Sequence, residues 1–446
     1  MTQVAFGWMG FGALLLVLAI RVPIALSLMS VGLGGLLALL WFQTGNFFGA
    51  VSAVTAVLYN TPYTFVAHFS LLAIPLFLLM GSFAAFSGAT TDAFAAARLW
   101  LGKLPGGLAQ ATIVTCAIFA AICGSSLATA AAMGRIAVPE MLRYGYDKGL
   151  ATGASAVGGT LGALIPPSIL MVLYGIFAEA SIAKLLIAGI VPGLMTAFSY
   201  LVVIWVRSKI NPSLAPHADI SATFREKIQA STGTFQIGFV FFVTVVSIYA
   251  GYATVTEAAA VGAIVVLILG IVRGRLNRQS FAESLLDSAK QTGMIFAIAV
   301  GAKIFVTFIG FTGVAGSMTS WVGAQGITPL QFIIGLSIIY IILGMFLDPL
   351  GIMLLTLPIV LPLITHMGFD PIWFGPLLVK YIEIGCITPP VGLNIFVLKA
   401  VVGDTVKLET IFKGVLWFFI ADIVVVAIMI AFPETVLFLP NLMLGN

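Results

Sequence analysis

The sequence predicts an all-α, multi-pass membrane protein made of two inverted-topology repeats, and three observations support this prediction. Of the 446 residues, 61% are hydrophobic and only 8% are charged, whereas a soluble domain carries about 25% charged residues. The two halves of the chain share prolines, glycines and charged residues in a single register. The lysines and arginines gather on one side of the membrane if the second half is inverted. Together these observations exclude a water-soluble globule.

Apolar segments long enough to span a membrane, about 20 residues each, recur along the whole chain. In the first half they are 5–20, 23–42, 69–88, 107–123, 150–177 and 186–206. In the second half they are 234–250, 255–272, 293–312, 329–347, 372–399 and 415–432. The polar segment 207–233 is predicted to be a cytoplasmic linker between a first repeat, 1–206, and a second repeat, 234–446. Segment 273–290 mixes apolar and charged side chains, as expected of a helix lying at the membrane interface.

The repeats are visible as identical residues 223 positions apart. The matched residues are Pro139 with Pro362, Gly145 with Gly368, Asp147 with Asp370, Gly162 with Gly385, Pro166-Pro167 with Pro389-Pro390, Leu170 with Leu393, and Lys184-Leu185 with Lys407-Leu408. Most of them break helices or are rare in this chain, so chance does not explain the match. Internal repeats of this kind are typical of secondary transporters.

The distribution of positive charge predicts how the repeats cross the membrane. Segments 107–142 and 329–365 are predicted to be re-entrant hairpins that turn near Gly124-Ser125-Ser126 and Leu347-Asp348-Pro349. Each half then crosses five times, so the second half is inverted relative to the first. With the linker in the cytoplasm, all but three of the 20 lysines and arginines are cytoplasmic, in agreement with the positive-inside rule. The exceptions are Lys184, Lys303 and Lys380.

Two kinds of motif are candidates for binding. At the first hairpin tip, small residues and hydroxyls over Cys123–Gly134 leave backbone carbonyls free to meet a cation; a small-residue packing face between helices is the alternative. Within 150–177 and 372–399, glycines and the Pro-Pro pairs interrupt the helix. Broken helices at membrane depth offer N–H groups to an anion and carbonyls to Na⁺; a simple proline kink is the alternative.

Ionisable residues in apolar spans are further candidates because each costs at least about 2.5–3.5 kcal/mol at the bilayer centre. Asp348, at the second hairpin tip, is a candidate Na⁺ ligand, with a capping aspartate as the alternative. Lys303 is a candidate contact for a substrate anion, with a snorkelling or paired lysine as the alternative. Lys380 and Glu383 lie three residues apart on one helix face and are candidates for pairing with one another.

The composition also argues against several classes of protein. The formal net charge is only +4 and is dispersed, so no nucleic-acid partner is expected. The three cysteines lie in apolar surroundings and the three histidines are far apart, so neither a disulfide framework nor a zinc site is expected. Ser125 and Ser126 have no nearby histidine base, and no span carries paired carboxylates at metal-binding spacing. An enzyme and an organic cofactor are therefore not expected, and lipid surrounds the chain.

Several segments taken together are specific to one family of membrane proteins. They are Gly124-Ser125-Ser126, Gly134–Pro139, Gly145-Tyr146, Gly158–Ser168, Ala188–Gly193, Thr256–Ala260 and Pro358–Pro362. In these segments the chain resembles the large membrane (M) subunit of the TRAP (tripartite ATP-independent periplasmic) transporters. The resemblance implies an elevator-type, Na⁺-coupled importer of a small organic acid, a carboxylate or sulfonate, in a bacterial inner membrane. It implies two partners, a separate four-helix membrane subunit of the Q type and a periplasmic substrate-binding protein of the P type.

The resemblance also implies that the hairpin tips and broken helices form the binding sites. It assigns Na⁺ binding, at two or more sites, to Gly124, Ser125, Gly159, Gly162, Asp348, Gly385, Thr388 and Pro389. It assigns substrate contacts to Ser125, Ser126, Thr160, Pro166 and Asn394. The alternative function is a self-sufficient Na⁺/dicarboxylate symporter of the same broad architecture, which needs no binding protein. An ion channel is less consistent with paired broken helices in an inverted repeat.

Overall fold

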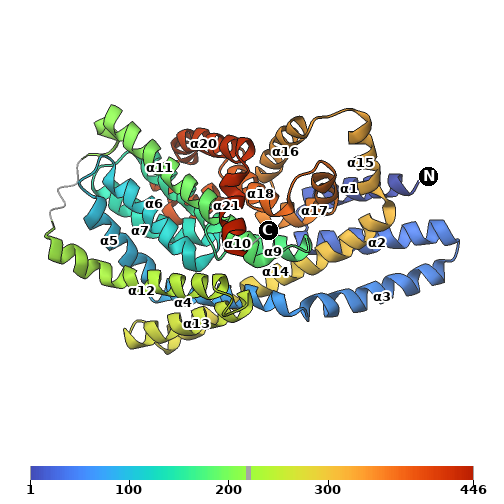
Figure 1. Ribbon diagram of the computed structural model, residues 1–446, viewed down its shortest axis with the longest axis horizontal. Helices are drawn as coiled ribbons and strands as arrows, with labels where there is room; N and C mark the ends of the chain where they lie inside the picture. The colour runs from blue at the N-terminus through green and yellow to red at the C-terminus, as the bar shows by residue number, and fades with distance from the viewer. Residues whose placement is uncertain (1, 217–221, 445–446) are drawn as a thin grey trace.

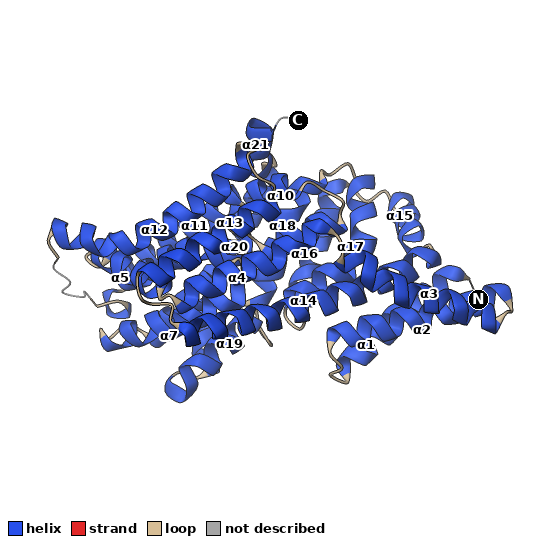
Figure 2. Cartoon of the chain, turned by 90° about the horizontal axis from the view of Figure 1, so that it is seen from below, coloured by secondary structure: helices blue, strands red, loops and turns tan. Residues whose placement is uncertain are grey.

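In the computed structural model, residues 2–216 and 222–444 are described, and within these ranges all regular structure is helical (Figures 1 and 2). Eight described segments are long and apolar enough to cross a membrane. These findings confirm the predicted all-α, multi-pass membrane protein. His217 and Asp219, which belong to the predicted linker, lie outside the described residues.

The helices of the first half lie close to the predicted apolar segments. They are α1 (Gln3–Ala19), α2 (Ile24–Thr44), α3 (Phe47–Val66), η1 (Phe69–Leu72), α4 (Ala73–Phe86), α5 (Ala89–Leu101), α6 (Gly107–Cys123), α7 (Ser126–Arg143), α8 (Lys148–Leu164), α9 (Ile169–Phe177), α10 (Ile182–Ala188) and α11 (Ile190–Ile210). Local chemistry explains the boundaries. Gly45, with φ 66°, ends α2, and the Asn46 side chain caps α3 by accepting from the Gly49 N–H. Helices α3 and α5 were not predicted, and neither is among the segments long and apolar enough to span a membrane.

The second half has a similar order of elements. They are η2 (Pro212–Leu214), α12 (Phe224–Tyr249), α13 (Val255–Val272), α14 (Arg278–Thr312), α15 (Val314–Ala324), α16 (Pro329–Gly344), α17 (Pro349–His366), α18 (Pro371–Cys386), α19 (Leu393–Val402), η3 (Gly403–Thr405), α20 (Leu408–Ala431) and α21 (Glu434–Leu444). Capping boxes begin α12, α13 and α16, with Thr223, Thr254 and Thr328 as their N-caps.

Two predicted boundaries differ from the structure. The interfacial helix predicted at 273–290 is not a separate element, because the chain continues from Arg278 to Thr312 as the single 35-residue helix α14. No proline lies between the amphipathic part and the apolar part to stop it. At 1.5 Å per residue α14 is about 52 Å long, well above the roughly 30 Å hydrocarbon core. The predicted linker is also shorter than 207–233, since α11 extends to Ile210 and α12 begins at Phe224.

Helices of the first half pack against helices of the second half to form a shared scaffold. Helix α2 packs along α14, α13 packs along α4, and α3 runs beside both α2 and α14 (Figure 1). Glycines allow close approach: a Cβ on Gly301 of α14 would lie 2.6 Å from the Ala25 carbonyl oxygen of α2. Small residues at helix contacts are how membrane helices pack without a hydrophobic driving force. Helices from both halves therefore complete each other's packing.

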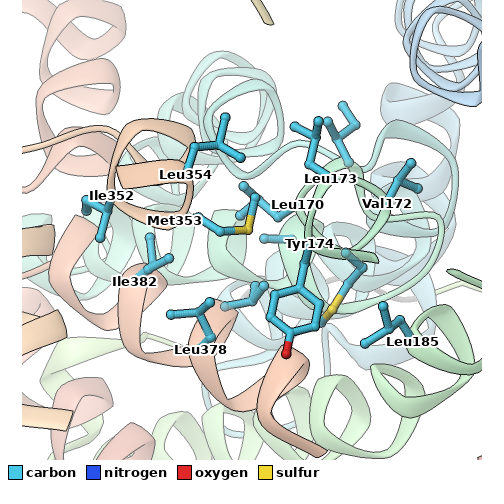
Figure 3. Close-up of a cluster of buried hydrophobic side chains, with 14 of the residues drawn as sticks. Leu170, Val172, Leu173, Tyr174, Leu185, Ile352, Met353, Leu354, Leu378 and Ile382 are labelled. Atoms are coloured by element: carbon cyan, nitrogen blue, oxygen red, sulfur yellow. The ribbon is translucent and has the colours of Figure 1, made fainter. Parts of the chain in front are cut away.

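A buried apolar cluster joins α9 to the second hairpin and to α18 (Figure 3). Its labelled members are Leu170, Val172, Leu173 and Tyr174 of α9, Leu185 of α10, Ile352, Met353 and Leu354 of α17, and Leu378 and Ile382 of α18. The Tyr174 hydroxyl donates to the Pro371 carbonyl at 2.7 Å, which satisfies the one polar atom that this tyrosine brings into the cluster. The cluster fixes the first half's α9 against the second half's hairpin.

Candidate functional site

The first hairpin turns where the sequence places small residues. Helix α6 ends at Gly124, with φ 64°, and the Ser125 side chain caps α7 by accepting from the Ala128 N–H at 3.4 Å. The turn touches the break between α8 and α9, because the Gly124 carbonyl accepts from the Ile169 N–H at 3.4 Å. A Cβ on Gly124 would lie 2.3 Å from the Pro167 carbonyl oxygen, so only glycine allows this approach in a left-handed conformation.

Two glycines of α8 bring its backbone against the start of α7. A Cβ on Gly162 would lie 2.7 Å from the Ser125 carbonyl oxygen, and one on Gly159 would lie 2.9 Å from the Ser126 carbonyl oxygen. The structure thus brings together Gly124, Ser125, Gly159 and Gly162, the four first-half residues predicted to bind Na⁺. Buried Pro166 lies in the break itself, where prolines remove backbone donors and leave carbonyls without helical partners.

The second hairpin repeats this arrangement with a carboxylate at its tip. Asp348 is the N-cap of α17 and accepts from the Gly351 N–H at 3.0 Å. Near the tip, α16 and α18 cross closely, since a Cβ on Gly385 would lie 2.4 Å from the Gly344 Cα. Thr388, in the break between α18 and α19, donates to the Ile384 carbonyl at 2.6 Å. Pro389 is exposed, unlike its counterpart Pro166, so the second break is the more open of the two. The Pro-Pro peptide is cis in both breaks.

A polar cluster connects the first hairpin to the second broken helix. The Glu383 carboxylate of α18 interacts with the Ser126 hydroxyl at the start of α7 and with the Asn394 amide at the start of α19. Glu383 and Asn394 are completely buried and Ser126 is 6% exposed. Neither carboxylate oxygen of Glu383 and neither polar atom of the Asn394 side chain makes a hydrogen bond of normal geometry. Such orphaned polar atoms in a buried place point to a missing ligand.

A second buried network involves Lys380 and corrects its predicted pairing. The Lys380 ammonium lies 2.5 Å from Asp422 Oδ1 of α20 and donates to Thr196 Oγ1 of α11 at 3.1 Å. It forms no ion pair with Glu383 within the described residues. The Tyr200 hydroxyl donates to the same Asp422 carboxylate at 2.8 and 2.9 Å. Asp422 outcompetes Glu383 because it stands opposite Lys380 across the interface between α18 and α20.

Two predicted substrate residues, Thr160 and Lys303, have other neighbours than the Glu383 cluster. The Thr160 hydroxyl donates to the Val157 carbonyl at 2.7 Å and lies 3.2 Å from the Tyr200 hydroxyl, which places it in the Lys380 network. Lys303 is exposed and lines a cavity of about 510 Å³ between α3, α14 and the end of α9, together with His68 and Glu179. The structure therefore does not bring Lys303 to the residues at the tips, and a substrate contact for either residue stays a prediction.

Sequence reasoning missed Asp422 and Tyr200 as members of a site. Asp422 was detectable as the one carboxylate inside the apolar segment 415–432. Its pairing with Lys380 was not detectable, because Lys380 lies 42 residues earlier in the chain. Glu383 could be identified from the sequence, but the absence of an ion pair with the neighbouring Lys380 could not.

The fold and this arrangement of paired hairpins and broken helices define a multi-pass membrane transporter. In structure the chain is similar to the YdaH transporter of Alcanivorax borkumensis, with a TM-score of 0.61 at 13% identity, covering 86% of this chain and 90% of that one. This likeness concerns the fold alone.

Sequence comparison gives the family. Residues 11–435 match the family described as tripartite ATP-independent periplasmic transporter, DctM component. The chain is 38% identical over 414 residues to the C4-dicarboxylate TRAP transporter large permease protein DctM of Pseudomonas aeruginosa, covering 92% of this chain and 94% of that protein. It is 29% identical over 441 residues to the sialic acid TRAP transporter large permease protein SiaM of Vibrio cholerae, covering 99% and 98%.

The chain belongs to the DctM component family of the TRAP transporters. It is a transporter permease rather than an enzyme, and a multi-pass protein of the bacterial inner membrane. The resemblance to the TRAP M subunit that the sequence motifs indicated is thereby confirmed.

Proposed function

We propose that the chain is the large transport subunit of a Na⁺-coupled TRAP transporter, which imports a small organic acid delivered by a periplasmic binding protein. The observation that carries this proposal is the meeting of two hairpin tips with two broken helices. Each hairpin contacts both broken helices: α7 packs against α8 and α19, and α17 packs against α18 and α9. Helix ends and unpaired carbonyls from both halves then converge on a common region.

The residues at the tips fit a hard monovalent cation. Carbonyl oxygens of the proline-containing breaks, the Ser125 hydroxyl and the Asp348 carboxylate are oxygen donors, and half-helix ends with unwound carbonyls are the usual Na⁺ ligands in such transporters. Gly124, Gly159 and Gly162 would line the first site, and Gly385, Thr388 and Pro389 would line the second, next to Asp348. Na⁺ moving down its gradient would supply the free energy for uptake. Ser126 and Asn394, beside both tips, would contact the substrate.

An elevator movement agrees with how the helices divide. The hairpins and broken helices, α6–α9 and α16–α19, contact one another across the two halves, as α7 does with α19 and α17 with α9. They would form the moving body, and α2, α3, α4, α13 and α14 would form the scaffold. The cavity that contains Lys303 lies at the border between α9 of the moving body and α3 and α14 of the scaffold. A polar, loosely packed border suits two bodies that slide past each other better than a dry, interlocked interface does.

The substrate class follows from the relatives' names. Those described above carry C4-dicarboxylates and sialic acid, and both are small carboxylates. A small four-helix membrane subunit of the Q type and a soluble P-type binding protein are the proposed partners.

Reconstitution tests the proposal. The chain, with its small membrane subunit, is placed in liposomes with an inward Na⁺ gradient and supplied with labelled succinate or sialic acid, with and without the binding protein encoded beside it. We expect uptake only with all three components and with Na⁺, and no uptake when choline replaces Na⁺. Robust uptake of free substrate by this chain alone would favour the self-sufficient symporter instead.

A further inference from the structure

The Glu383 carboxylate occupies a place where an isolated charge is unfavourable. It is completely buried inside a membrane-embedded bundle, and neither oxygen makes a hydrogen bond of normal geometry. The N-terminal N–H groups of α7 and α19 begin beside it but do not donate to it. A buried carboxylate without hydrogen bonds of normal geometry is expensive to maintain, so its charge needs a further partner.

The nearby charges leave Glu383 unbalanced. Lys380 lies one turn earlier on α18, but its ammonium is held by Asp422 at 2.5 Å and by Thr196 at 3.1 Å. The Asp422 carboxylate in turn is fully engaged by Lys380 and by Tyr200. One positive and two negative charges therefore face one another across α18, α20 and α11. The formal net charge of Lys380, Asp422 and Glu383 together is minus one. This charge matches a single monovalent cation and is too small for a divalent one.

The groups around Glu383 supply the right atoms for such an ion. The carboxylate oxygens, the Asn394 amide oxygen and the Ser126 hydroxyl are all hard oxygen donors. A proton would neutralise the carboxylate and let it pair with the Asn394 amide, but it would leave the Ser126 hydroxyl oxygen without a role. A cation coordinated by both groups satisfies the carboxylate and the amide oxygen together.

We propose that Glu383, Asn394 and Ser126 form an additional Na⁺ site, distinct from those predicted around Ser125 and Asp348, whose charge-bearing ligand is Glu383. Ser126 and Asn394 would border both this ion and the substrate. The proposal rests on the Na⁺-coupled function proposed above and deepens it. Ser126 belongs to the first half's hairpin and Asn394 to the second half's broken helix. Na⁺ at this site would therefore tie the two halves together, which gives the ion a role in holding the substrate region closed.

The test is the thermal stability of the purified chain in detergent against NaCl concentration, with choline chloride holding ionic strength constant. In Glu383→Gln the side chain keeps its size and loses its charge. Without Na⁺ we expect the variant to be at least as stable as the wild type, because an unpaired buried charge has been removed. With Na⁺ we expect its gain in Tm to be smaller and its half-maximal Na⁺ concentration to rise at least tenfold. Glu257→Gln, which changes the exposed capping-box carboxylate of α13 in the same way, is the matched control and should keep the wild-type Na⁺ response.

Uptake by the complete transporter provides a second readout. We expect the Hill coefficient for Na⁺ to fall by about one in Glu383→Gln, and Ser126→Ala to weaken Na⁺ in the same direction should Glu383→Gln not fold. A wild type with no Na⁺ response would refute the proposed coupling itself. If the wild type responds to Na⁺ and Glu383→Gln responds in the same way, only the site at Glu383 is refuted. A variant that keeps its Na⁺ response but loses the pH dependence of uptake would show that Glu383 carries a proton, which also overturns the proposal.

Discussion

Separating Lys380 from Asp422 should destabilise the protein more than any other single change of charge. The two groups are 0% and 1% exposed and 2.5 Å apart. Removing one partner of a buried pair leaves the other charge uncompensated and costs about 3–5 kcal/mol. Asp422→Asn keeps an oxygen that accepts from Tyr200, so we expect the lower end of that range. Lys380→Met leaves a carboxylate supported only by the Tyr200 hydroxyl, so we expect the upper end.

The double variant Lys380→Met/Asp422→Leu separates the charge effect from mere disruption. It removes both charges and fills their volume with apolar groups, which is often neutral or stabilising relative to the ion pair. Tyr200 still keeps the Thr160 hydroxyl 3.2 Å away. We expect the double variant to unfold at a higher temperature than either single variant, as measured by tryptophan fluorescence in detergent. Single variants as stable as the wild type, or a double variant as unstable as the two losses added, would refute this reasoning.

Three further predictions address the tips, the close crossing and the topology. Asp348→Asn should raise the Na⁺ concentration for half-maximal uptake and slow the maximal rate; if neither changes, Asp348 is only a helix cap worth about 1 kcal/mol. In Gly385→Ala the new Cβ would lie 2.4 Å from a Cα of α16, which should cost about 1–3 kcal/mol of stability. Gly335→Ala, whose new Cβ would meet nothing within 4 Å, should not change the stability. Equal losses of thermal stability in the two variants would contradict the close crossing of α16 and α18. A cysteine at Ser213, predicted to be cytoplasmic, should resist an impermeant maleimide added to intact cells, while one at Gln325, predicted to be periplasmic, should react. The native cysteines are buried and should add little background. Efficient labelling at Ser213 would disprove the inverted arrangement.

Local signals in the sequence predict much of the helical layout. Pro-Pro pairs remove backbone donors wherever they stand, and the structure ends α8 at Leu164 and α18 at Cys386, just before them. Asp348 precedes a proline at a turn, and it caps α17. These features depend on a few adjacent residues, so a single sequence contains them. The inverted relation of the two halves stays a prediction.

Contacts between residues distant in the sequence could not be predicted from these local signals. Lys380 was expected near Glu383 because both lie on one helix face, yet Asp422 meets it from another helix. The separation of α14 into an interfacial and a spanning helix was predicted from a change in composition at Lys290. Helix geometry carries across that change because nothing there stops it. Pairing partners and helix continuity depend on tertiary packing rather than on local pattern.

The packing of first-half helices against second-half helices has a consequence for biosynthesis. Helix α4 leaves the ribosome roughly 170 residues before α13, its packing partner, a delay of about 10–30 s at a synthesis rate of about 5–20 residues per second. Helix α2 waits longer still for α14. During that interval the glycine-lined faces of the early helices contact lipid or the insertion machinery instead of protein. Helices α2 and α4 therefore enter the membrane before their main partners exist, and the shared scaffold assembles only when the second half arrives.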